Sequence, residues 1–122
     1  ILLQAPEYHD VLILIGRTNA WQGNYEQAES YFKEVLEKDR TFEDAYNAYA
    51  DNEFWQGDYK MALQVINQGL KHYPQNKSLL ERKIKVLDQL GKQNQAWKIY
   101  KELKKLDPDY KELSNLRKYI GE

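Results

Sequence analysis

Cysteine is absent from this chain of 122 residues, so the chain forms no disulfide and offers no thiolate to a metal ion. Its two histidines, His9 and His72, are far apart and lack partners at metal-ligand spacing, and we expect both at the surface. The serines lack the context of a catalytic nucleophile, and no glycine-rich loop could hold a phosphate. We therefore predict a protein that is not an enzyme, with no cofactor and no metal.

Long apolar runs are missing as well. The longest is Val11–Ile15, whereas a membrane-spanning helix needs about 20 apolar residues. No basic segment precedes the apolar residues at the start of the chain, so these residues do not form a signal peptide. We expect no membrane span within this chain.

An overall excess of one charge is also absent, because 18 Lys and Arg nearly balance 19 Asp and Glu. The charges are nevertheless unevenly distributed, since residues 1–75 carry a net charge of −6 and residues 76–122 a net charge of +5. The basic part lacks the interleaved aromatic or glycine-rich pattern that is typical of nucleic-acid binding. We expect a solvated helix surface there and no nucleic-acid partner.

The chain does contain a repeat with a period of 34 residues. The glycines that mark this period are Gly23, Gly57 and Gly91. The alanines that follow them, each after five residues, are Ala28, Ala62 and Ala96. Apolar residues between these positions recur with the roughly 3.6-residue period of an amphipathic helix. Such a repeat predicts an all-α array of helix-turn-helix units.

The pattern divides the chain into three full repeats with a further segment at each end. We expect residues 1–8 to be the end of a preceding repeat, with Pro6 in its closing turn, and residues 111–122 to form a capping helix. The full repeats span 9–42, 43–76 and 77–110. The predicted helices are 8–21, 25–38, 43–56, 59–72, 77–90, 93–106 and 110–120.

Polar residues predict where several of these helices begin. Asn24 and Asp58 precede the second helix of the first two repeats, where such side chains accept free backbone N–H groups. Asp109 and Glu112 predict a capping box for the last helix. The alanine of each second helix predicts close contact with the first helix, because a larger side chain would overpack that contact.

These positions resemble the tetratricopeptide repeat. The matching residues of the first repeat are Leu12, Ile15, Gly16, Gly23, Tyr25, Ala28 and Phe32. Those of the second are Tyr46, Tyr49, Ala50, Gly57, Tyr59, Ala62, Ile66 and Pro74. The third repeat departs from the pattern at Lys83, Ile84 and Gln93. The resemblance implies a right-handed superhelix of stacked antiparallel helix pairs, a scaffold that binds a protein or peptide in its concave groove.

Two segments, residues 16–23 and 51–57, are also similar to the periplasmic repeat domain of YaiO-type bacterial outer-membrane proteins. In that family the repeats precede a C-terminal β-barrel, and related proteins serve exopolysaccharide export. This second resemblance implies a periplasmic location, tethered to the outer membrane, and a polysaccharide ligand as the alternative to a protein partner. A cytoplasmic scaffold is the alternative location.

The tetratricopeptide resemblance further implies that the first helix of each repeat lines the groove. The groove residues of the first repeat are then Asp10, Ile13, Arg17, Ala20 and Trp21. Those of the second are Asp44, Asn47, Asp51, Phe54 and Trp55. Those of the third are Ser78, Glu81, Lys85, Asp88 and Gln89.

Two questions stay open for these residues. Trp21 and Trp55 either hold a sugar ring or a peptide side chain, or pack between successive repeats. Arg17, Asp51 and Lys85 share one repeat position, and they either clamp a polar ligand or form an ion-pair ladder between stacked helices.

Two expectations concern partners. Chaperone-tail-binding repeats need Lys and Asn where this chain has Ile13 and Arg17, so we expect no heat-shock chaperone tail as the ligand. The chain begins within a repeat, so we expect it to be a fragment of a longer protein. The repeat face that such a truncation exposes predicts self-association into a homo-oligomer, which the truncation itself can cause.

Overall fold

The helices of this protein form antiparallel pairs that stack side by side. The computed structural model describes residues 6–120. Its long helices are α1 (Pro6–Trp21), α2 (Tyr25–Lys38), α3 (Glu43–Trp55), α4 (Tyr59–His72), α5 (Lys77–Gln89) and α6 (Gln93–Leu106). A short helix, α7 (Leu113–Leu116), and a 3-10 helix, η2 (Arg117–Ile120), follow. The predicted all-α fold is confirmed, and the six long helices lie within two residues of their predicted positions.

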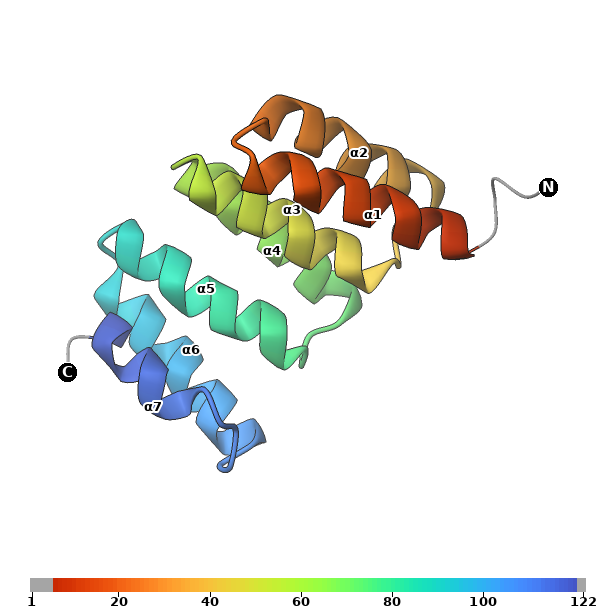
Figure 1. Ribbon diagram of the computed structural model, residues 1–122. Coiled ribbons are helices and arrows are strands. Elements are labelled where there is room, and N and C mark those ends of the chain that lie inside the picture. Colours follow the sequence, from red (N-terminus) through yellow and green to blue (C-terminus); the bar gives the residue numbers. More distant parts are fainter. Residues whose placement is uncertain (1–5, 121–122) are drawn as a thin grey trace.

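The pairs α1/α2, α3/α4 and α5/α6 build a solenoid with two layers. Helices α1, α3 and α5 lie side by side in one layer, and α2, α4 and α6 form the other (Figure 1). We call the first set the A helices and the second set the B helices. Each A helix contacts the next A helix as well as its own B helix. The A layer is therefore one continuous surface that crosses all three repeats.

A glycine connects the two helices of each pair. Gly23, Gly57 and Gly91 have φ angles of +83°, +89° and +74°, which lie in the left-handed region. A side chain with a Cβ atom is strained there, whereas glycine is not. The same turn therefore joins the two helices of each pair in the same relative orientation, which explains why the glycine recurs with the repeat.

Small side chains allow each pair of helices to approach closely. Ala28, Ala62 and Ala96 are fully buried, as predicted. Gly16 serves the same purpose on α1, because a Cβ atom placed there would lie only 2.9 Å from Cζ of Phe32. Gly69, which the sequence pattern does not single out, has Leu79 and Tyr46 at the same short distance. Close packing of the helix pairs therefore depends on small residues at a few positions.

The predicted start of the chain differs from the structure. Pro6 begins α1, two residues before the predicted position, and does not lie in a turn that closes an earlier repeat. Proline suits the first turn of a helix, where its missing N–H group costs no hydrogen bond. Residues 1–5, assigned to the preceding repeat, lie outside the described residues.

The predicted capping box of the last helix is wrong. Residues 111–112 form a turn, and α7 begins only at Leu113, with no capping hydrogen bond from the Glu112 side chain. Asp107 organises this segment instead, because its carboxylate accepts hydrogen bonds from the backbone N–H of Asp109 (3.2 Å) and from Nζ of Lys77 (2.9 Å). The segment then ends with Ile120 buried against the last repeat.

The predicted helix caps are correct in part. Asp58 accepts a hydrogen bond from the backbone N–H of Met61 at 3.2 Å, as expected for the start of α4. Asn24 makes no capping hydrogen bond, and its Nδ2 atom lies 3.5 Å from Oδ1 of Asn19. Asn76 caps α5 through the N–H group of Leu79 at 2.9 Å, which the sequence analysis did not identify.

A buried polar cluster joins the first two repeats. Glu53 of α3 is 1% exposed and accepts hydrogen bonds from Nδ2 of Asn52 (3.1 Å) and Nε2 of Gln56 (2.9 Å). Asn52 also donates to the backbone carbonyl of Tyr25 at 3.1 Å. Burial, with the nearby carboxylate of Glu29, raises the pKa of Glu53 above its ordinary value.

Replacing the central alanine tests the packing of the pairs. We expect Ala62→Leu to lower the free energy of unfolding by about 1–3 kcal/mol, because the fully buried site has no room for a larger side chain. Gln64→Leu, on the exposed side of the same helix, should change it by less than about 0.5 kcal/mol. Urea denaturation measures both, and equal stability of the two variants would contradict the packing role.

The raised pKa of Glu53 predicts a pH-dependent stability. The stabilising contribution of the protonated carboxyl is present below the ordinary pKa of 4.5 and is lost as the pH rises through the raised folded-state pKa. We expect Glu53→Gln, which has no proton to lose, to gain stability relative to the unchanged chain between about pH 4 and pH 7. Urea midpoints across this range measure the gain, with the exposed Glu102→Gln as control. A pH-independent difference would refute the prediction.

Candidate functional site

The surface of the A layer holds most of the predicted groove residues, but not all of them are accessible. Asp10, Trp21, Asp44 and Trp55 are exposed. Arg17, Asp51, Phe54 and Lys85 are partly exposed. Ile13 and Asn47 are buried, at 6% and 8% exposed, so they offer little surface to a ligand. Ala20 is buried as well.

The burial of Ile13 and Asn47 follows from the packing of the A layer. These two residues occupy the same repeat position on α1 and α3. Ile13 belongs to the hydrophobic core that the first two repeats share. Because α1 packs directly on α3, and α3 on α5, residues at the contacts between A helices are covered by the next repeat. The accessible groove is therefore narrower than the repeat positions imply.

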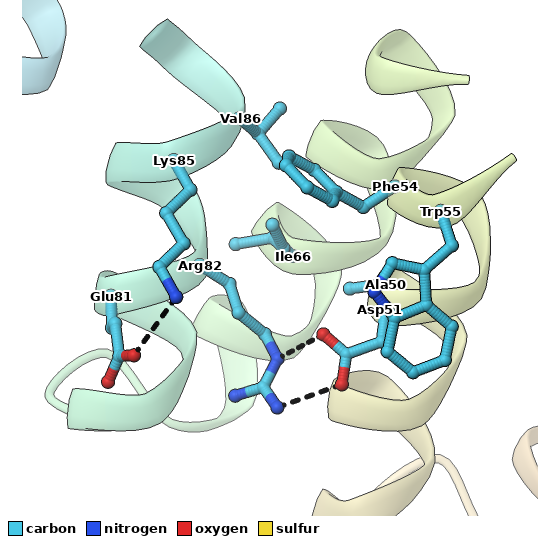
Figure 2. Close-up of a pocket in the computed structure, with 9 residues that line it drawn as sticks. All are labelled: Ala50, Asp51, Phe54, Trp55, Ile66, Glu81, Arg82, Lys85 and Val86. Carbon is cyan, nitrogen blue, oxygen red and sulfur yellow. Dashed lines mark hydrogen bonds and ion pairs between the residues drawn. The ribbon is translucent and has the colours of Figure 1, made fainter. Parts of the chain in front are cut away.

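An ion pair across the A layer links the second repeat to the third. The carboxylate of Asp51 accepts hydrogen bonds from Nε and Nη2 of Arg82 at 2.8 and 2.9 Å (Figure 2). Nη1 of Arg82 donates to the backbone carbonyl of Ser78 at 3.2 Å. Burial lowers the pKa of Arg82, but the hydrogen bond and charge of Asp51 outweigh this effect and raise it overall. The two-point contact holds Arg82 in one orientation.

The predicted row of alternating charges exists only in part. Arg17 lies 3.5 Å from Oδ2 of Asp51, which joins the first repeat to the second. Lys85 does not reach Asp51, and its Nζ lies 3.4 Å from Oε2 of Glu81 on its own helix. The cation of the third repeat that pairs with Asp51 is therefore Arg82 and not Lys85.

Arg82 was missed because it lies at a repeat position outside the implied groove set. The equivalent residues of the other repeats are Leu14 and Ala48, both without charge. The sequence does contain one sign of this contact. Arg82 stands at a position that is apolar in the other repeats, and the preceding repeat holds Asp51 as a possible partner. The length of the Arg82 side chain carries the guanidinium group across to α3, which spacing within one repeat does not reveal.

A pocket of about 140 Å³ opens between α3 and α5. Its apolar lining consists of Ala50, Phe54, Trp55, Ile66 and Val86. Its charged lining consists of the Asp51–Arg82 and Glu81–Lys85 pairs. Figure 2 shows Phe54 and Val86 together on one side of Ile66, with the Asp51–Arg82 pair on the other. The predicted residues Asp51, Phe54, Trp55 and Lys85 are brought together here, whereas Asp10, Trp21 and Asp44 lie outside.

Two tryptophans are exposed on the A helices. Trp21 of α1 is 64% exposed and Trp55 of α3 is 45% exposed, at equivalent positions of neighbouring repeats. Trp21 is therefore largely open to solvent, whereas Trp55 is partly covered and lines the pocket between the second and third repeats. Phe54 behaves differently, since its ring contacts Tyr59 edge-on with the centroids 5.3 Å apart. An exposed indole offers a flat apolar face and an N–H donor to a ligand.

The histidines do not form a site. His9 is 6% exposed and lies edge-on to Phe42 with the ring centroids 5.2 Å apart, so the expectation of a surface position is wrong for it. His72 is exposed, as expected. Within residues 6–120, no three His, Cys, Asp or Glu side chains gather as metal ligands would. None of the helices described here has the length and apolar character needed to cross a membrane.

The fold and the site together define a helical-repeat domain with a pocketed A layer. The family model described as tetratricopeptide repeat matches residues 22–80. The match covers just under half of the chain, and the arrangement of the helices is that of the tetratricopeptide-repeat fold. Comparison with curated proteins found no match in sequence.

Several solved structures share this fold, and two of them are tetratricopeptide-repeat domains. The first such domain of Spaghetti (RPAP3), bound to an HSP90 peptide, is 22% identical with a TM-score of 0.82, over 94% of this chain and 92% of that one. The second domain of human RPAP3, in complex with an HSP70 peptide, is 18% identical with a TM-score of 0.83, over 97% and 99%. The Yersinia enterocolitica type III secretion chaperone SycD, with a peptide of the translocator YopD, is 18% identical with a TM-score of 0.82, over 95% and 92%.

The ion pair between α3 and α5 carries a stability prediction. We expect Asp51→Asn to lower the free energy of unfolding by about 1–2 kcal/mol, because it leaves the half-buried guanidinium of Arg82 without its counter-charge. Asp44→Asn removes an exposed carboxylate from the first turn of α3 and should cost less than about 0.5 kcal/mol. Urea denaturation at low and moderate salt compares the free energies of unfolding of the two variants. A loss no larger for Asp51→Asn than for Asp44→Asn would contradict the assigned role.

Proposed function

We propose that this domain is a non-catalytic scaffold that binds an extended segment of a partner protein across its A layer. In this arrangement one apolar side chain of the partner enters the pocket between α3 and α5. The observation that carries the proposal is the pocket itself, which has an apolar lining, a half-exposed indole at Trp55, and charges that are already paired. Known structures of this fold hold peptides, which supports the class of ligand.

The paired charges argue for an apolar anchor rather than an acidic one. Arg82 is held by Asp51, and Lys85 is held by Glu81, so neither cation is free to neutralise a carboxylate of the ligand without losing its present partner. An apolar side chain needs no such exchange, and it gains from leaving water. The charged pairs then form a polar rim that can meet the backbone amides of the partner segment.

The tryptophans would extend the contact beyond the pocket. Trp55 lines the pocket and Trp21 occupies the equivalent position one repeat earlier. Large aromatic side chains with accessible faces commonly supply a large share of the binding energy of an interface. A partner segment running from α5 toward α1 would meet Trp55 first and Trp21 next.

A polysaccharide ligand is the second candidate. The exposed indoles of Trp21 and Trp55, with the exposed carboxylates of Asp10 and Asp44 on the same helices, favour it, because sugar rings stack on aromatic faces and their hydroxyls donate to acids. A sugar-binding domain of this kind would be periplasmic, as the resemblance to YaiO-type proteins implies. The apolar pocket favours the peptide over the polysaccharide.

A binding experiment separates the two candidates. A phage-displayed library of random 12-mer peptides and an array of bacterial polysaccharides serve as probes. We expect peptides with a medium-sized apolar residue to be selected, and Trp55→Ala to weaken them by roughly tenfold or more. Trp97→Ala, which removes a 39% exposed indole from α6 in the other layer, is the matched control and should leave binding unchanged.

Two results would contradict the proposal that a peptide binds in the pocket. Selected peptides that bind the Trp55→Ala variant as tightly as the unchanged chain would place the binding surface elsewhere. Retention of a polysaccharide but of no peptide, with loss of the polysaccharide in the Trp21→Ala/Trp55→Ala variant, would replace the leading proposal with the second.

A further inference from the structure

A groove of about 500 Å³ lies between α2 and α4 on the B layer, away from the pocket of the A layer. Its floor is formed by Tyr46 and Tyr49 of α3, which are 3% and 6% exposed. Leu36 of α2 lines one side, and Gln68 of α4 lines the other. We call it the B-layer groove. The packing of the first two repeats on each other sets its shape, because all three of its helices belong to these repeats.

The lining of the B-layer groove is mainly basic. Among the described residues that line it, three are cations and one, Glu37, is an acid. The cations are Lys33, Arg40 and Lys71, and all three are exposed. Residues 1–75 hold only 6 Lys and Arg beside 12 Asp and Glu. Half of these cations therefore gather in one groove of an otherwise acidic part of the chain.

Two of the three cations have no counter-charge. Lys33 is held by Glu29, with Nζ and Oε2 2.8 Å apart. Within residues 6–120, the side chains of Arg40 and Lys71 make neither an ion pair nor a hydrogen bond. The cations of the A-layer pocket, by contrast, are both paired. A carboxylate from outside can therefore bind Arg40 and Lys71 without breaking an existing ion pair.

A departure from the repeat pattern makes this groove different from the next one. Arg40 occupies the position at which the two later repeats have a proline, Pro74 and Pro108. The equivalent groove between α4 and α6 is lined by Pro74, and by Glu102 at the position of Gln68. One cation is lost there and one carboxylate is gained. The basic character is therefore a property of the first groove and not of the repeat in general.

The backbone of Arg40 is fixed at the edge of the groove. The hydroxyl of Tyr46 donates to the backbone carbonyl of Arg40 at 2.6 Å. Burial raises the pKa of Tyr46, and the positive charge of Arg40 opposes that rise. The charge of Arg40 therefore acts close to the tyrosine floor, where it can meet an anion that lies on the rings.

We propose that the B-layer groove binds an acidic segment of a partner protein, at a second site that is independent of the A-layer pocket. Carboxylates of the segment pair with Arg40 and Lys71, which belong to opposite sides of the groove. An apolar side chain between them packs on Leu36 and the tyrosine floor. The α2 side runs from Lys33 to Arg40, roughly 10 Å, which an extended segment of about three residues spans.

Fluorescence anisotropy with synthetic peptides tests this site. The probes are labelled peptides that combine two glutamates with one leucine in every order, within a neutral glycine and serine background. One set of controls has glutamine in place of both glutamates, and another has serine in place of the leucine. We expect at least one glutamate peptide to bind, with an affinity that falls as the salt concentration rises. Both control sets should bind at least tenfold more weakly.

Variants of the chain locate the bound peptide. Arg40→Glu/Lys71→Glu should weaken binding at least tenfold, and Arg40→Gln should weaken it less, because that change removes a charge without reversing it. Lys105→Glu changes the lysine that occupies the position of Lys71 in the next repeat, and this matched control should leave binding unchanged. All three residues are exposed, so the circular dichroism and thermal midpoint should stay unaltered.

The same double variant separates this site from the proposed function of the A layer. Peptides selected for the A-layer pocket should bind Arg40→Glu/Lys71→Glu as tightly as they bind the unchanged chain. Failure of the acidic peptides would then leave the A-layer proposal standing, and failure of the A-layer peptides would leave this one standing.

Any of four results would overturn the proposal of an acidic partner segment. The first is that no glutamate peptide binds, and the second is that either control set binds equally well. The third is binding that survives Arg40→Glu/Lys71→Glu. The fourth is binding that is lost with Lys105→Glu, which would place the peptide on the basic surface of α6.

Discussion

Close contact between paired helices is the constraint on which the rest of this structure depends. Each B helix approaches its A helix at a fully buried alanine, and α1 adds a glycine where Phe32 fills the space of a missing side chain. The contact sets the distance between the two layers, and the left-handed glycine turn sets their direction. Because both features recur every 34 residues, each repeat places its A helix beside the previous one. The continuous A layer, and any site upon it, follows from that geometry.

The A layer is also held together by long side chains that cross between repeats. Asp51 accepts hydrogen bonds from Arg82 in the next repeat and lies 3.5 Å from Arg17 in the previous one. One carboxylate on α3 therefore connects all three repeats on the surface that we propose binds a partner. The same pair forms the polar side of the pocket, so the charges that join the repeats also shape the site.

Repetition made much of this fold predictable, and departures from repetition limited the prediction. The six long helices and the buried alanines follow from local periodicity, and they lie where the pattern places them. The turns at residues 108–109 and 111–112 do not. Asp107 accepts hydrogen bonds there from the nearby backbone N–H of Asp109 and from Lys77, which lies 30 residues away in the sequence. His9 is buried for a similar reason, since the ring of Phe42, from the loop before α3, lies against it.

The sequence by itself determined the repeat, the helix pairs, the glycine turns and the set of residues from which a groove could be built, because all of these depend on spacing along one helix or one turn. Only the tertiary structure decided which of those residues a ligand can reach. It buried Ile13 and Asn47 between neighbouring helices, left Trp21 and Trp55 exposed, and brought Arg82 to Asp51. The physical reason is that exposure and ion pairing depend on what the next repeat covers, and no single helix contains that information.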